Sequence, residues 1–141
     1  MNSVAYHEAG HAVTSFILNS KIYRVSIEPQ NGSAGNVWSE RLVNHSIEYD
    51  NSCRNQCRVE RKIMILLAGH EAQKMFRPSS IRRHHRASDM QAVANLLSRI
   101  AANGEEQDAY MRLLRIRTRN LLSAKWHCVQ AVAKPSSPCA Q

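Results

Sequence analysis

The stretch SVAYHEAGHAVTSFIL, residues 3–18, carries most of the information on the fold in this sequence. Its apolar residues recur near helical spacing, and Asn2 or Ser3 can cap the first turn, so we expect one helix from there to Leu18. His7 and His11 stand four residues apart. On a helix, this spacing places both imidazoles on the same face, one turn apart.

Two imidazoles at this spacing can bind one tetrahedral zinc ion, at about 2.0–2.1 Å from each nitrogen. Glu8, directly after the first histidine, does not bind metal in such sites. Its carboxylate projects beside the open coordination position and can take a proton from a zinc-activated water as the water attacks a peptide carbonyl. The motif therefore predicts a zinc metallopeptidase with His7 and His11 as ligands and Glu8 as general base.

A third protein ligand has to come from elsewhere in the chain. Asp89 is a candidate, because it stands at the start of a predicted helix after a loop. The same position also suits an aspartate that only caps that helix together with Ser88. His84 or His85, in the preceding basic loop, could replace Asp89 as the ligand.

The rest of the chain predicts a small sheet followed by helices. Alternating polar and apolar residues indicate strands at 21–28 and 34–41, joined by a turn, and a third strand near 42–43. Helical patterns cover 48–76, 88–102 and 105–132. The predicted fold class is α+β, predominantly helical: a zincin-like active-site helix, a small antiparallel sheet with an edge strand, then three helices. Residues 1–133 would form one domain, and residues 134–141 a flexible tail.

Composition limits the classes of protein that this chain can belong to. No apolar run approaches the roughly 18–20 residues that a bilayer crossing needs, and no stretch looks like a signal peptide, so we expect a cytoplasmic protein. The net charge of +8 attracts anionic partners. Because Trp126 and Tyr110 stand at core-like positions rather than among exposed basic residues, nucleic-acid binding is the weaker interpretation.

The segment VAYHEAGHAV, residues 4–13, resembles the active-site helix of the FtsH-type zinc metallopeptidases, the peptidase domains of membrane AAA+ proteases. Further segments resemble that family in the same order: RVSIEP at 24–29, AGNVW at 34–38, ILLAG at 65–69 and ASDMQAVA at 87–94. The resemblance implies that Asp89 is the third zinc ligand. It also implies that substrate binds in extended form along an edge strand, at Gly35, Asn36 and Val37.

The chain also departs from the family pattern. Gln73 and Lys74 occupy a region that usually carries acidic residues in the family, and the loop before Asp89 is unusually basic. The sequence contains no counterpart of the ATPase or of the transmembrane helices, so it is a stand-alone relative or a fragment. Any ATP dependence would need a separate ATPase partner, and the resemblance also allows a homo-oligomer. The alternatives are a catalytically weak or inactive FtsH-like fold that acts as an interaction module and, less favoured, a basic nucleic-acid-binding protein.

Overall fold

The computed structural model describes residues 2–18, 22–26, 36–39, 53–81 and 87–134. Helix α1 (Ser3–Ile17) carries the histidine motif. The Asn2 side chain accepts a hydrogen bond from the backbone N–H of Val4 at 3.0 Å, which confirms the predicted cap. Most residues of α1 from Ala5 to Ser15 are buried, so the motif lies on a central helix rather than on a surface one.

Helix α2 (Cys53–Phe76) is the longest helix of the described chain. Its second half is buried from Ile63 to Gln73, as the apolar run at 63–68 predicts. The predicted start at residues 48–52 lies outside the described residues. Pro78 follows the helix and begins the short 3-10 helix η1 (Pro78–Ser80), because proline cannot continue the α-helical hydrogen-bond ladder.

Three more helices complete the described chain: α3 (Ala87–Ile100), α4 (Gly104–Ala124) and α5 (Trp126–Ala133). The prediction of one helix over residues 105–132 is wrong, because the backbone leaves helical geometry at Lys125, with φ −114° and ψ 24°. Because of this break, α4 and α5 run in different directions and pack against different helices. Leu114 of α4 packs with α2 and α3, whereas Val129 of α5 packs against α1.

Strands β1 (Ile22–Ser26) and β2 (Asn36–Ser39) pair in antiparallel register. Val25 faces Val37 and Ser26 faces Asn36, with an irregularity between Ile22 and Arg24. Both strands contact α1. The predicted turn, the third strand near residues 42–43 and the tail at 135–141 lie outside the described residues.

The predicted α+β class is contradicted, because the described fold is helical. Within the described residues there are five α-helices, four of them after the strands rather than the predicted three. Every residue of the two buried hydrophobic clusters lies on a helix. Local alternation marks a strand but does not say where the core forms, and here helix packing forms it.

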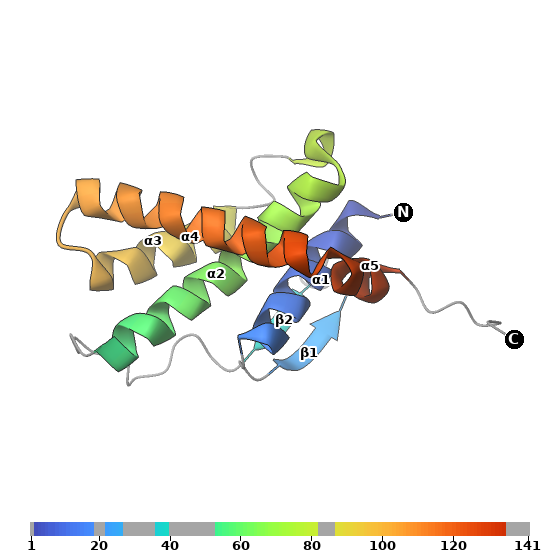
Figure 1. Cartoon of the computed structure of the whole chain (residues 1–141), viewed down its shortest axis with the longest axis horizontal. Coiled ribbons are helices and arrows are strands. Elements are labelled where there is room, and N and C mark those ends of the chain that lie inside the picture. The colour runs from blue at the N-terminus through green and yellow to red at the C-terminus, as the bar shows by residue number, and fades with distance from the viewer. Residues whose placement is uncertain (1, 19–21, 27–35, 40–52, 82–86, 135–141) are drawn as a thin grey trace, which may run out of the picture.

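Helix α2 connects the two clusters. It contacts α1 on one side and α3 and α4 on another, while α5 covers α1 (Figure 1). None of the described helices combines the length and apolarity that a bilayer crossing requires.

Helices α1 and α2 approach each other closely because small residues line their contact. A Cβ at Gly10 would lie 2.6 Å from the Cβ of Ala72 and 3.0 Å from the carbonyl carbon of Ala68. Such distances are well below the roughly 3.5–4.0 Å of ordinary carbon contacts. Gly10 therefore lets α2 lie directly against the face of α1 that carries the histidines.

Candidate metal centre

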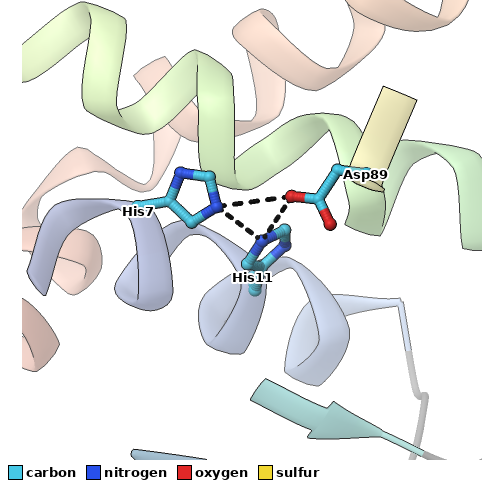
Figure 2. A group of neighbouring side chains, drawn as sticks. All are labelled: His7, His11 and Asp89. Atoms are coloured by element: carbon cyan, nitrogen blue, oxygen red, sulfur yellow. Dashed lines mark hydrogen bonds and ion pairs between the residues drawn. The ribbon is translucent and has the colours of Figure 1, made fainter. Parts of the chain in front are cut away.

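His7, His11 and Asp89 form a compact cluster of the type that can hold a metal ion (Figure 2). The two histidines come from α1 and the aspartate from the first turn of α3. Nε2 of His7 and Nε2 of His11 are 3.1 Å apart, and each lies 3.4 Å from Oδ2 of Asp89. The structure thus brings together three residues that are separated by up to 82 positions in the sequence.

The outer nitrogen of each imidazole is held by α2. Nδ1 of His11 lies 2.7 Å from the backbone carbonyl oxygen of Ile65, and Nδ1 of His7 lies 3.0 Å from Oε1 of Gln73. A carbonyl oxygen only accepts hydrogen bonds, so each Nδ1 carries the proton and donates it. In the neutral imidazoles both Nε2 atoms therefore present a lone pair, and these are the two atoms that converge on Asp89.

The donor set fits a tetrahedral zinc ion. Zinc binds imidazole nitrogen and carboxylate oxygen at about 2.0–2.2 Å, so two ligand atoms on one tetrahedron lie about 3.3–3.6 Å apart. The three separations here are 3.1, 3.4 and 3.4 Å. Histidine ligands in such sites usually donate their other ring N–H to a carbonyl or carboxylate, as both do here. The residues present therefore suit zinc in number, chemistry and spacing.

The charges in the cluster favour an anionic Asp89. Burial opposes the charged carboxylate. When the imidazoles are protonated on both nitrogens, however, hydrogen bonds from His11 and His7 and their positive charge hold the pKa of Asp89 far below its usual value. Burial likewise opposes the charged form of His11, yet the hydrogen bond and charge of Asp89 raise the pKa of His11. Both pKa shifts show that a positive charge between these three groups is stabilising. A bound metal ion would also supply such a charge.

Glu8 is buried beside this cluster, with 4% of its surface exposed. Burial raises the pKa of Glu8, and the charge of Asp89 adds to this effect, while His11 and His7 act in the opposite direction. Its Oε2 atom has no hydrogen-bond partner among the described residues. A buried carboxylate oxygen without a partner is costly, and it is typical of a group whose partner is a bound ligand or solvent.

Gly69 of α2 lies directly under the two imidazoles. A Cβ at this position would stand 2.6 Å from Cε1 of His11 and 2.7 Å from Nε2 of His7, and still closer to Nε2 of His11. Only glycine leaves room for both rings. The sequence showed Gly69 as part of a family-like segment, but its role against the histidines emerges from the packing.

Some predicted site residues cannot be compared with the structure. His84, His85 and Gly35 lie outside the described residues, as does the basic loop at 82–86. Asn36 and Val37 lie in β2, next to α1. The motif and spacing identified His7, Glu8 and His11, whereas Gln73 and the carbonyl of Ile65 were missed as contacts of the histidines.

The basic face of α4 is partly neutralised by acidic residues of α2. Nε of Arg115 lies 3.3 Å from Glu71, which is buried, and Nε of Arg119 lies 4.0 Å from the same carboxylate. The aromatic ring of Trp126 stacks on Tyr6 with centroids 5.6 Å apart, and the Tyr110 hydroxyl accepts a hydrogen bond from Gln56. Both rings are partly buried against the hydrophobic clusters, so neither is a fully exposed platform for stacked bases.

The comparisons with known proteins point in the same direction as the cluster. No protein-family model matches this chain. An ATP-dependent zinc metalloprotease FtsH from Trieres chinensis is 28% identical to it over 95 residues. The match covers 66% of this chain and 14% of that protein, so the chain spans a small part of its relative's length. A similarity of this strength indicates at most a distant relationship to the FtsH-related proteases.

Proposed function

We propose that this chain is a zinc-dependent metalloendopeptidase domain, formed by residues 1–133, that hydrolyses peptide bonds. One observation carries the proposal: three electron-pair donors converge within 3.1–3.4 Å, and both imidazoles are held with their proton on the far side. The three donor atoms repel one another unless a cation or added protons lie between them. The similarity to an FtsH zinc metalloprotease supports zinc as that cation.

In this proposal His7, His11 and Asp89 hold the ion. Bound zinc would supply a Lewis acid that polarises water and the peptide carbonyl. Glu8 accepts the proton of the attacking water and delivers it to the leaving amine. Burial raises the pKa of Glu8, which makes it a stronger base than an exposed carboxylate, and its unpartnered Oε2 is available for that proton.

Substrate would bind in extended form beside the metal centre. Strand β2 contacts α1 and pairs with β1 along one edge, and no other described strand pairs with its second edge. An extended peptide can bind to such an edge through main-chain hydrogen bonds. We assign this edge, at Gly35, Asn36 and Val37, to the substrate backbone. An unfolded protein suits this mode of binding, and folded substrates would need a separate ATPase partner.

The test combines metal content with hydrolysis of casein, with and without a chelator. Protein from a zinc-replete preparation should contain about one zinc per chain, and both His11→Ala and Asp89→Ala should lose it. Glu8→Gln should keep the zinc but lower hydrolysis by about 10²–10⁴-fold, the usual contribution of a general base. Glu105→Gln, the same change at an exposed glutamate of α4, should match wild type.

Each part of the proposal can fail separately. Zinc-free wild-type protein would refute the metal site, and full zinc occupancy in Asp89→Ala would refute Asp89 as ligand. Zinc-loaded wild type that cleaves casein no faster than Glu8→Gln would refute the peptidase and support an interaction module built on the same fold.

A further inference from the structure

The amide of Gln73 stands between the metal centre and the segment that leads to Asp89. Its Oε1 lies 3.0 Å from Nδ1 of His7, and its Nε2 lies 3.2 Å from both the backbone oxygen and Oγ of Ser80. Gln73 is 4% exposed, so these contacts form with little competition from water.

The orientation of the amide follows from Ser80. The backbone oxygen of Ser80 can only accept a hydrogen bond, so it requires the NH₂ group of Gln73. The Ser80 hydroxyl donates its single proton to the carbonyl oxygen of Arg77 at 2.7 Å, so toward Gln73 it can only accept. Two independent contacts thus place the NH₂ group at Ser80 and leave the carbonyl oxygen facing His7.

The amide oxygen then fixes the tautomer of His7. Because Oε1 accepts, Nδ1 of His7 must carry the proton, and Nε2 keeps its lone pair toward His11 and Asp89. A glutamate could accept from His7 but could not donate to Ser80. Only an amide serves both neighbours, which explains on physical grounds why glutamine suits this position.

The Ser80 contact matters because of where the chain goes next. Ser80 ends η1, and Asp89 follows nine residues later in the first turn of α3. Helix α2 therefore holds one ligand through Gln73 and, through the same side chain, the start of the connection to another. Ligands that are oriented in this way bind zinc about 10–100-fold more tightly than ligands without such support.

We propose that Gln73 is a positioning residue with two functions: its carbonyl oxygen holds His7 in the metal-binding tautomer, and its NH₂ group fastens the Ser80 end of the connection to Asp89. The inference rests on the proposed zinc site for its effect on affinity. The hydrogen bonds themselves belong to the metal-free protein and can be measured there.

The test uses the full chain after chelation, at a pH where the imidazoles are neutral. Long-range proton–nitrogen NMR correlations report which ring nitrogen carries the proton, and the carbonyl-carbon shift of Ser80 reports its hydrogen bond. In wild type, both His7 and His11 should carry the proton on Nδ1. Gln73→Leu should release His7 to a mixture of tautomers and shift the Ser80 signal. His11 should stay unchanged, because the backbone of Ile65 holds it.

Gln73→Glu separates the two functions. It should preserve the His7 tautomer, since a carboxylate still accepts, but it should shift the Ser80 signal as Gln73→Leu does. Gln91→Leu is the matched control, the same change at an exposed glutamine of α3, and should leave every signal in place. Competition with a chromogenic chelator should show zinc affinity reduced about 10–100-fold in Gln73→Leu relative to Gln91→Leu.

An unchanged His7 tautomer in Gln73→Leu would overturn the first function, and an unchanged Ser80 signal in Gln73→Glu would overturn the second. Equal zinc affinities of Gln73→Leu and Gln91→Leu would refute the role of Gln73 in metal binding. Wild type that binds no zinc would instead refute the proposed function, and the NMR signals would still decide whether Gln73 orients His7.

Discussion

Replacing Gly69 by alanine should remove zinc while leaving the helices folded. The new Cβ would stand 2.6 Å from Cε1 of His11 and 2.7 Å from Nε2 of His7, where carbon contacts require about 3.5–4.0 Å. The rings would have to retreat by about 1 Å, against hydrogen bonds to Ile65 and Gln73 that hold them in place. Ligand distances in a metal site tolerate only about ±0.2 Å.

The magnitude follows from that displacement. In enzymes, a misplacement of a positioned group by about 1 Å lowers the reaction rate by on the order of 10²-fold. Applied to zinc affinity, this factor corresponds to about 2.8 kcal/mol. Alanine in a helix interior is intrinsically more favourable than glycine by about 0.5–1 kcal/mol. The substitution should therefore lower the free energy of unfolding by less than it weakens the free energy of zinc binding. We therefore expect at least a hundredfold weaker zinc binding with a helical circular-dichroism spectrum close to that of wild type.

The matched control is Gly104→Ala in α4. A Cβ at Gly104 meets no atom within 4 Å, so the same chemical change has no steric effect there. Zinc affinity is measured by chelator competition, and folding by thermal unfolding of the chelated proteins. If Gly69→Ala binds zinc as tightly as Gly104→Ala, then the two imidazoles do not occupy the space above Gly69 in the metal-bound protein, and the proposed ligand geometry is wrong.

Two further predictions concern stability. In the chelated protein, the raised pKa of His11 contributes stability that is complete below about pH 6.5 and is lost as the pH rises through the folded value. The lowered pKa of Asp89 contributes stability that is present above about pH 3.9 and is lost in acid. The raised pKa of Glu8 contributes stability that is likewise lost as the pH rises through its folded value. The melting temperature should therefore fall below about pH 4 and should be lower at about pH 8 than at about pH 5. Asp89→Asn should make this profile flatter, and a wild-type profile that is flat from about pH 5 to 8 would contradict this account. Leu114→Ala, at a fully buried position between α2, α3 and α4, should lower the free energy of unfolding by about 2–5 kcal/mol, whereas Leu113→Ala, at a side chain 43% exposed, should change it by less than about 1 kcal/mol. Urea denaturation measures both, and equal losses would mean that α4 does not pack as described.

The features that the sequence predicted well are those that depend on neighbouring residues. The cap at Asn2 and the extent of α1 follow from local hydrogen bonding and periodicity, and both are confirmed. The break at Lys125 was missed, because lysine is an ordinary helix residue and the change of direction is required by packing on α1 and α2. The contribution of the sheet to the fold was overestimated for a similar reason. Alternating polar and apolar residues predict a strand, but they do not predict which elements form the core.

The metal centre shows where local reasoning could have gone further. Ile65, Gly69 and Gln73 follow one another at intervals of four residues, so they lie on one face of α2. His7 and His11 have the same interval on α1, and the contacts run in opposite order, with Gln73 at His7 and Ile65 at His11. Two antiparallel helices in contact through a glycine therefore match a pair of ligands to a pair of hydrogen-bond acceptors. That register could have been proposed from spacing alone once the two helices were paired. The distant Asp89 could not, because the residues around it suited a helix cap equally well, and only the fold shows its carboxylate facing both histidines.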